Sequence, residues 1–206
     1  LPLEWRVPPV GAPRIQSEST RRNVASPAVE FDWATETARH VGTVVHRELQ
    51  RIAREGKFDA TPGPATRQRF DDELAELGVP AERRVAAVDR VVTAVQRTID
   101  DERGRWLLDP RHTSAANELA LTGRIDGEIV SVIIDRTFVD ESGTRWIVDY
   151  KTSSHEGADL KGFLASEEQR YRPQLERYAA LMRRLGDEPV KLGLYFPLLS
   201  AWRTWS

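Results

Sequence analysis

The sequence of residues 132–152, VIIDRTFVDESGTRWIVDYKT, decides the fold. It contains two apolar runs that each end in a carboxylate, Asp135 in the first and Asp149 in the second. Continuous apolar runs of this kind are typical of strands that are buried on both faces. We therefore expect two buried strands, each of which delivers a charged group at its end.

The second run also places an acid and a lysine two residues apart. Because side chains alternate along a strand, Asp149 and Lys151 share one face while Tyr150 points to the other. A carboxylate and an ammonium group on one face can meet the same scissile phosphate, as in metal-dependent phosphodiesterases. Taken alone, such a pair is more often a solvated salt bridge that contributes little to stability. The apolar runs before both acids favour the catalytic interpretation.

The connection between the two strands decides whether the two acids meet. A five-residue connection from Asp140 to Thr144 pairs Asp135 with Asp149, whereas a four-residue connection pairs Asp135 with Val148. We expect the five-residue connection or a bulge. Two facing carboxylates repel each other, and a divalent cation resolves that conflict. Mg²⁺ suits such a site because it takes oxygen ligands and keeps waters that can serve a phosphate and a nucleophile.

The composition limits the class of protein. A length of 206 residues fits one domain with a substantial core plus extensions. Thirty basic residues against 32 acidic ones give a net charge of −2, which argues against holding nucleic acid by bulk charge. The lack of cysteine excludes disulfides, thiolate zinc sites and an iron–sulfur cluster, and it fits a cytoplasmic location. No apolar stretch approaches the ~20 residues of a membrane span, so we expect no membrane partner.

The N-terminal part differs in composition from the rest. Residues 1–32 are rich in proline and polar residues without an apolar period, so we expect a linker or wrapping arm there. We expect residues 33–206 to form one α/β domain. Since the chain begins with Leu1 and carries no signal peptide, we interpret it as a piece of a longer protein.

Apolar periodicity predicts the order of the elements. Helical spacing predicts helices over 33–55 and 66–77 and a long one after Pro80, whose apolar residues should form a bundle core: Val85, Val88, Val92, Val95 and Ile99. Alternation then predicts strands over 114–122, 129–139 and 144–150, with turns at 126–127 and 140–143. A helix over 166–185, a strand over 190–196 and an edge strand over 202–205 follow. This order predicts a central mixed sheet flanked by helices.

Short motifs in a particular order carry a resemblance. They are Gly42-Thr43-Val44-Val45-His46, Asp135, Asp149-Tyr150-Lys151-Thr152 and Gln174-Leu175-Glu176-Arg177-Tyr178. In this order they are similar to the motifs of the RecB-type nuclease domain, a branch of the PD-(D/E)xK nucleases with a restriction-endonuclease-like core. The similarity covers residues 33–196. In the RecB and AddA helicase–nucleases this domain is the C-terminal part of a UvrD-like helicase chain, so the resemblance implies a helicase portion.

The resemblance implies a role for each matching residue. The implied catalytic residues are Asp135, Asp149 and Lys151, and the implied metal ligands are His46, Asp135, Asp149 and the carbonyl of Tyr150. Gln174 and Tyr178, four residues apart on one helix face, are implied to position the substrate. Without the resemblance, a lone helical histidine is more often a surface residue, and Tyr178 could be core. Gly42 lies one turn before His46 and leaves a gap through which a strand or metal could approach.

Two further acids remain open at this stage. Glu118 matches an acid that can join the metal shell in this family, but a glutamate in a half-buried strand is as often an outward charge. Asp126 competes with Asp135 for the role of the first acid, because Gly123-Arg124-Ile125-Asp126 is similar to a Gly-x-x-Asp motif of the family. The Gly127 that follows makes Asp126 look like a turn residue instead.

Together these patterns predict a Mg²⁺-dependent deoxyribonuclease of the exonuclease type, in which Mn²⁺ could replace Mg²⁺. It would hydrolyse phosphodiester bonds during double-strand-break repair and recombination, on single-stranded DNA fed by a helicase in the same chain. A second helicase–nuclease subunit is a further implied partner. The chain has no Walker A motif, so ATP would act only in the helicase portion. The alternatives are a catalytically silent DNA-binding or docking module and an independent nuclease of repair or restriction.

Overall fold

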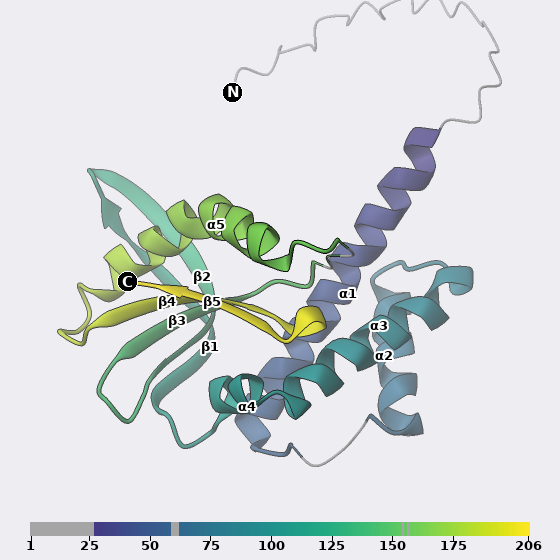
Figure 1. The fold of residues 1–206 in the computed structure, drawn as a ribbon, viewed down its shortest axis with the longest axis horizontal. Helices are drawn as coiled ribbons and strands as arrows, with labels where there is room; N and C mark the ends of the chain where they lie inside the picture. Colours follow the sequence, from purple (N-terminus) through teal and green to yellow (C-terminus); the bar gives the residue numbers. More distant parts are fainter. Residues whose placement is uncertain (1–26, 59–61, 154, 156) are drawn as a thin grey trace, which may run out of the picture.

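The computed structural model describes residues 27–58, 62–153, 155 and 157–206. A five-stranded sheet lies between two layers of helices (Figure 1). The elements in chain order are α1 (Pro27–Glu55), α2 (Pro64–Glu76), α3 (Ala81–Asp100), α4 (Glu102–Leu108), β1 (Thr113–Ile125), β2 (Glu128–Val139), β3 (Arg145–Tyr150), α5 (Leu160–Met182), β4 (Val190–Phe196), the 3₁₀ turn η1 (Pro197–Leu199) and β5 (Ala201–Trp205).

The strands follow one another across the sheet in chain order. β1 and β2, β2 and β3, and β4 and β5 pair antiparallel, while β3 and β4 pair parallel. The parallel pair follows from α5, which carries the chain from the end of β3 back to the start of β4, since parallel strands need a crossover connection. The predicted α/β fold, a central mixed sheet flanked by helices, is confirmed.

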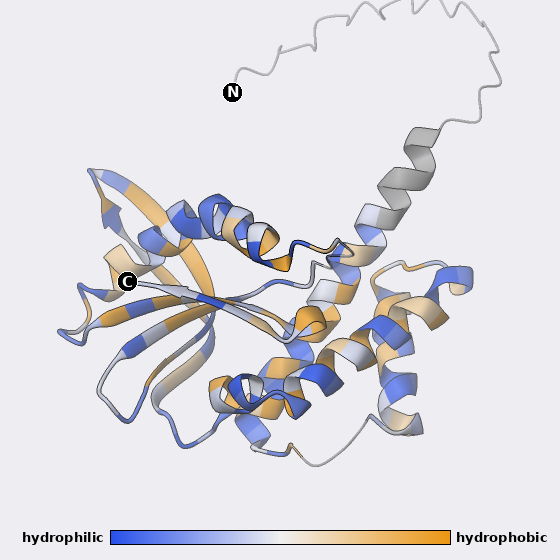
Figure 2. Cartoon of the chain, in the orientation of Figure 1, coloured by the Kyte–Doolittle hydropathy of each residue, from blue (hydrophilic) through white to orange (hydrophobic). Residues whose placement is uncertain are grey.

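Each face of the sheet has its own apolar core. On one face, α1 to α4 pack against β2, β3 and β4 through residues that include Val45, Leu49, Val91, Phe138 and Val148. On the other face α5 packs against the same strands, through residues that include Leu175, Ala179, Ile134, Ile147 and Leu194. Figure 2 shows the apolar segments along the strands and along α1 where it meets the sheet. The sheet is thus buried on both sides at its centre.

The predicted helices form, with shifted boundaries. In α1 the expected apolar residues Val41, Val45, Leu49 and Ile52 are all buried, and Gly56 follows the helix with a φ of +65°. α1 begins at Pro27, so residues 27–32 of the expected arm belong to a helix, and residues 1–26 lie outside the described residues. α5 begins at Leu160 rather than 166 because the Asp159 carboxylate caps it, accepting a hydrogen bond from the Gly162 N–H at 2.8 Å.

Three expectations need correction. Val85 is 70% exposed, because it lies in the first turns of α3 beside the polar Arg67 and Asp71 of α2. Ile133 is 55% exposed, so the first apolar run is not buried on both faces. The β2–β3 ladder ends at the pair Arg136 and Val148, and beyond that point α5 covers only one face of the β1–β2 hairpin. The short helix α4 was not expected from the sequence.

Among the helices that the structure describes, none has an apolar stretch long enough to cross a lipid bilayer.

The close approach of Trp202 to Gly193 generates a prediction. Gly193 lies in β4 opposite Val148 of β3, and a Cβ at this position would lie 2.1 Å from the Trp202 ring. Gly193→Ala should therefore lower the free energy of unfolding by about 1–3 kcal/mol, since overpacking forces a packed ring to move. Urea unfolding of Gly193→Ala, alone and in a Trp202→Ala background, measures the effect. An equal loss in both backgrounds would show that Trp202 is not the cause.

Candidate active site

The acids meet where β2 separates from β3. The last residue pairs of their ladder are Val139 with Arg145 and Arg136 with Val148, so residues 140–144 form the predicted five-residue connection. Continued by one residue, this register sets Asp135 opposite Asp149. At this point the ladder gives way to a side chain, because the Tyr150 N–H donates to Asp135 Oδ2 at 2.8 Å. The β2–β3 fork, as we call this place, holds the Asp135 carboxylate between the two strands.

The turn before β3 fixes this register. Asp140 Oδ1 accepts hydrogen bonds from the Ser142 and Thr144 N–H groups at 2.9 and 3.0 Å, and Oδ2 accepts from Trp146 Nε1 at 2.7 Å. Burial raises the pKa of the Asp140 carboxyl, but its hydrogen bonds outweigh burial and lower the pKa to about 2. Gly143, with a φ of +77°, closes the turn. Because a shift by one residue would turn Asp149 to the other face, this carboxylate helps to align the site.

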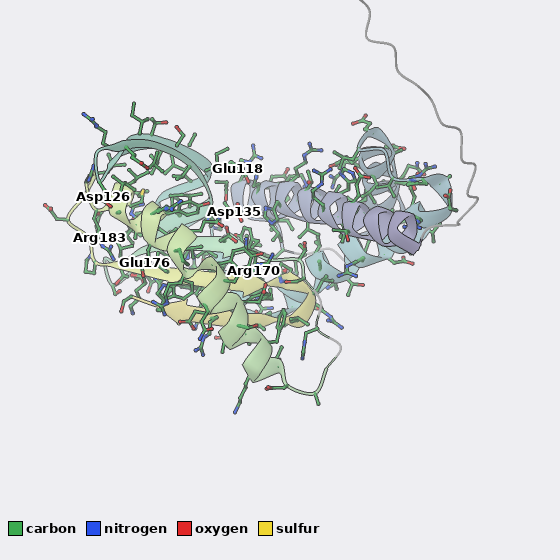
Figure 3. All side chains as sticks on the ribbon, turned by 90° about the horizontal axis from the view of Figure 1, so that it is seen from above. Glu118, Asp126, Asp135, Arg170, Glu176 and Arg183 are labelled. Atoms are coloured by element: carbon green, nitrogen blue, oxygen red, sulfur yellow. The ribbon has the colours of Figure 1, made fainter. Side chains whose placement is uncertain are left out.

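Three residues from three elements form a group that could hold a cation. His46 of α1, Glu118 of β1 and Asp135 of β2 each offer a ligand atom, and the three atoms lie within 4.8 Å of one another. His46 Nδ1 lies 3.6 Å from Asp135 Oδ2, and His46 Nε2 lies 3.0 Å from the Tyr150 carbonyl oxygen. In Figure 3, Glu118 and Asp135 lie close together, between α1 and α5. The ring of His46 thus contacts both Asp135 and the Tyr150 carbonyl, which the resemblance implied as fellow ligands.

Glu118 points into this group through an unusual backbone conformation. Its φ is +48°, in the left-handed region that a glutamate rarely adopts. The ladder between β1 and β2 skips Glu118, since its pairs there are Asn117 with Arg136 and Leu119 with Ile134. Gln50 Nε2 donates to Glu118 Oε1 at 2.8 Å. Gln50 was missed in the sequence, although its position one turn after His46 on the same helix could have indicated it.

Asp149 and Lys151 form the second half of the site, on the face covered by α5. Lys151 Nζ lies 2.6 Å from Asp149 Oδ2, in an ion pair whose angles leave this buried oxygen without a well-aligned hydrogen bond. Asp149 is only 4% exposed, and its Oδ1 accepts a bond from Gln174 Nε2 at 3.3 Å. The side chain of Tyr150 lies in the core on the other face, as the alternation predicts. The Asp149 carboxylate is directed at Lys151 and is not one of the three clustered ligand groups.

Helix α5 contributes polar groups beside Asp149. Gln174 Nε2 lies 2.6 Å from the Tyr178 hydroxyl, to which it donates. Burial raises the pKa of Tyr178, so the hydroxyl keeps its proton and can donate to a further acceptor. Tyr171, which the sequence did not single out, lies under Lys151, with Nζ 3.7 Å from the ring centroid. It lies three residues before Gln174, a helical spacing that places both on one face.

Asp126 does not belong to the site. Asp126 and Gly127 have φ values of +51° and +87° and connect the paired residues Ile125 and Glu128 in a two-residue turn. Asp126 is exposed at the tip of the β1–β2 hairpin and lies well away from Asp135, toward the end of α5 that carries Arg183 (Figure 3). The structure therefore favours Asp135 over Asp126 as the first acid of the fork.

Burial and repulsion set the charges of the fork. Burial of the Asp135 carboxyl, and next the negative charge of Asp149, raise the pKa of Asp135 to about 6, although His46 and the Tyr150 N–H act in the opposite direction. Burial lowers the pKa of Lys151, but the charge of Asp149 outweighs burial and the pKa is raised. Lys151 is therefore an ammonium group, while Asp135 holds a carboxylate that lacks sufficient positive charge nearby.

Two residues of the helical layer hold the chain after Lys151. A Cβ on Gly42 would lie 2.9 Å from Thr152 Oγ1, so the missing side chain lets the end of β3 approach α1. Arg90 of α3 donates to the Thr152 carbonyl at 3.4 Å. The chain at the end of β3 thus lies in the gap expected at Gly42. It brings the Tyr150 carbonyl within reach of His46, one turn further along α1.

The chain matches the family model of the PD-(D/E)XK nuclease superfamily over residues 22–200. It belongs to this superfamily. Among solved structures, the PD-(D/E)XK chain is similar to a crystal structure of protein VC1899 from Vibrio cholerae, with 15% sequence identity and a TM-score of 0.21. That likeness covers 69% of this chain and 44% of the VC1899 chain, so this chain spans less than half of it. None of the curated proteins compared with the chain matches it.

PD-(D/E)XK nucleases use divalent metals, and the donor set of this chain fits such an ion. The group of His46, Glu118 and Asp135 offers a nitrogen and carboxylate oxygens, and the Tyr150 carbonyl lies beside it. Carboxylate and carbonyl oxygens suit hard divalent cations. Burial and the charge of Asp149 raise the pKa of Asp135, and a cation beside this carboxylate would offset both effects. A histidine, two acids and a carbonyl on three strands and one helix therefore form the candidate metal centre.

The raised pKa of Asp135 predicts how the stability of the PD-(D/E)XK domain depends on pH. A carboxyl whose pKa is raised by folding stabilises the protein below its usual pKa near 4, and this contribution is lost as the pH rises through about 6. In the metal-free protein we expect a loss on the order of 2 kcal/mol between pH 4 and 7. Asp135→Asn, which cannot ionise, should lack this loss.

Urea unfolding in the presence of a chelator, at several pH values for both proteins, measures the difference. The difference between the two curves removes the contributions of all other titrating groups. Parallel curves from pH 4 to 7 would mean that Asp135 ionises in the folded protein without cost, and that the fork is not short of positive charge.

Proposed function

We propose that this PD-(D/E)XK domain is a Mg²⁺-dependent DNA nuclease that hydrolyses phosphodiester bonds. One observation carries the proposal. The candidate ligand group of His46, Glu118 and Asp135 lies beside the Asp149–Lys151 pair at the β2–β3 fork. The two halves come from segments that lie up to about a hundred residues apart in the chain. Such an arrangement supplies both a metal centre and a cationic group for one scissile phosphate.

In this proposal His46, Asp135, Asp149 and the Tyr150 carbonyl would hold the metal, with Glu118 as a further ligand. A Mg²⁺ ion held there, which Mn²⁺ could replace, would supply a Lewis acid for the phosphate and for the attacking water. Asp149 would thus have two roles, as a metal ligand and as the partner of Lys151 in an ion pair. Lys151, kept protonated by Asp149, neutralises negative charge that develops on the phosphate oxygens or orients the attacking water.

Gln174 and Tyr178 position the substrate in this proposal. The hydrogen bond from Gln174 orients the Tyr178 hydroxyl, whose proton remains available for a phosphate or sugar oxygen. Gln174 also contacts Asp149, so the two residues connect the strand that carries the metal site to the helix that faces the substrate. The ammonium group of Lys151 lies over the ring of Tyr171, and this cation–π contact helps to hold it in place.

The proposed biological role rests on the order of the motifs and on the net charge of the chain. We infer a RecB-type, exonuclease-like domain of a cytoplasmic helicase–nuclease that acts in double-strand-break repair and recombination. A net charge of −2 gives little general attraction for DNA, so a helicase portion, and with it a second subunit, would deliver single strands to the site. The silent-module alternative is disfavoured because the acids and the lysine are all present and converge.

Loss of the Asp149–Lys151 pair should abolish cleavage. We expect Asp149→Ala and Lys151→Ala to reduce the rate of single-stranded DNA cleavage in Mg²⁺ on the order of 100-fold or more. The first removes a proposed metal ligand and the partner of Lys151, and the second removes the cation proposed to face the phosphate. Asp126→Asn, a change of charge at the exposed hairpin turn, should cleave as the wild type does. The assay compares linear with circular single strands and linear duplexes, each with Mg²⁺, Mn²⁺ or a chelator.

The outcomes of this assay separate the proposals. Cleavage of linear but not circular single strands supports the exonuclease type. Full activity of Asp149→Ala would rule out the proposed active site. A wild type that binds DNA but cleaves no substrate with either metal would favour the silent module.

Glu118 and Gln50 allow a separate test of the metal group. Glu118→Gln should weaken Mn²⁺ binding strongly, and Gln50→Leu, which removes only the hydrogen bond to Glu118, should weaken it about 10-fold, as expected for a residue that orients a ligand. Calorimetric titration with Mn²⁺ measures both effects without DNA. Arg39→Gln, an exposed change on the same helix, is the control. If Glu118→Gln binds Mn²⁺ as tightly as the wild type, Glu118 is an outward charge and not a ligand.

A further inference from the structure

A groove of about 880 Å³ leads away from the β2–β3 fork, between the β1–β2 hairpin and α5. It shares Gln174 and Tyr178 with the candidate active site. We propose that this groove binds the DNA strand that is cut, as a single strand with its bases against the hairpin and its phosphates toward Arg170 and Arg177. The inference rests on the proposed nuclease function and names the surface and the form of the substrate.

The hairpin supplies an apolar wall for bases. Beyond the β2–β3 fork β2 pairs only with β1, and the cross-strand partners Leu121 and Val132 are half-buried on the side facing α5. Both line the groove, and Val130 extends this apolar wall along β2. Unpaired bases gain from contact with such a wall because their faces are apolar. A duplex hides those faces inside its stack and gains little.

Helix α5 supplies the opposite, cationic wall. Arg170, Gln174 and Arg177 recur at a spacing of four and three residues, so they lie along one face of the helix, and all three line the groove. Arg170 and Arg177 are separated by about 10 Å along the axis, or roughly three steps of a stacked strand. Gln174, which lies between them, contacts Asp149 of the catalytic pair. A strand held by both arginines would therefore pass the site where cleavage is proposed.

The two arginines are available for phosphates. Arg177 is exposed and makes no ion pair with any carboxylate in the described part of the chain. Arg170 is 69% exposed in its side chain and contacts Glu167 at 3.6 Å, a loose pair that a phosphate could displace. Its neighbour Arg172, by contrast, is engaged with Glu168 and Glu176. Arg177, without an ion pair, and Arg170, with only a loose one, give the groove a local positive charge that the overall net charge of −2 does not reveal.

The test measures binding in the absence of divalent metal, so that no cleavage occurs. Fluorescence anisotropy with a labelled oligothymidylate at several salt concentrations compares the wild type with Arg170→Gln/Arg177→Gln. We expect the double variant to bind about tenfold more weakly at low salt. The slope of log K against log salt should fall by about 1.4, as expected for the loss of two phosphate contacts on a single strand. Arg183→Gln, an exposed arginine at the end of α5 far from Asp135 (Figure 3), is the matched control and should leave both values unchanged.

Two further probes test the apolar wall. The wild type should bind an abasic oligonucleotide of equal length, and a duplex of equal length, more weakly than the oligothymidylate. Equal affinity for all three would overturn the placement of bases on the hairpin. An unchanged affinity and salt slope in the double variant, or an equal loss in Arg183→Gln, would overturn the groove.

The outcome for the groove is distinguishable from the outcome for the proposed nuclease. If the double variant loses binding while the wild type cleaves no DNA with Mg²⁺ or Mn²⁺, the groove stands and the nuclease function fails. If the wild type cleaves DNA while the double variant binds and cleaves as it does, the nuclease stands and the groove fails. Melting temperatures of all variants, which we expect to match the wild type, exclude loss of the fold as the cause.

Discussion

The Asp135 carboxylate, held between β2 and β3 by the Tyr150 N–H, is the contact on which the arrangement of the site depends. It accepts a hydrogen bond at the place where the backbone ladder ends, and so it lets the strands separate without leaving that amide unpaired. The same contact fixes Asp135 opposite Asp149, where burial, and next the negative charge of Asp149, raise the pKa of Asp135. The Asp135 carboxylate thus both pairs the amide at the end of the ladder and contributes negative charge to the site.

The helical layers complete the fork from both sides. On one side, α1 approaches closely enough at Gly42 for His46 to reach the Tyr150 carbonyl. On the other side, α5 places Gln174 on Asp149 and Tyr171 under Lys151. Because α5 is also the crossover that makes β3 and β4 parallel, the topology of the sheet and the position of these polar groups have the same cause. The functional groups therefore come from the elements that bury the sheet.

Much of this arrangement was predictable from the sequence because it follows from local patterns. Alternation placed Asp149 and Lys151 on one face, the length of the connection set the register, and helical periodicity identified the buried face of α1. Ile133 and Val85 were assigned wrongly to buried positions, because periodicity shows which residues are apolar and not where the covering layer ends. The seven-residue helix α4 is too short for periodicity to reveal.

The features that the sequence did not reveal depend on distant contacts. The left-handed conformation of Glu118 carries no signal in its own residue type, since glutamate is unusual there. It shows only when the neighbouring strand, His46 and Gln50 are in place. Residues held in sparsely populated conformations cost about 1–3 kcal/mol each, so the structure around Glu118 must compensate for it. Such a cost is common at functional sites. Sequence patterns left the role of Glu118 undecided because the contacts that hold this conformation come from residues distant in the chain.

The charges at the β2–β3 fork also indicate an order of events for the proposed reaction. Three acidic residues, Glu118, Asp135 and Asp149, lie at the fork with one lysine, Lys151, which is already paired with Asp149. A phosphate approaching this group meets net negative charge in a partly buried place, where repulsion is stronger than in water. A bound divalent cation would offset this negative charge. In the proposed reaction DNA would therefore enter the cleavage position after the cation, and the α5 arginines that we propose as strand-binding residues would hold the strand before that happens.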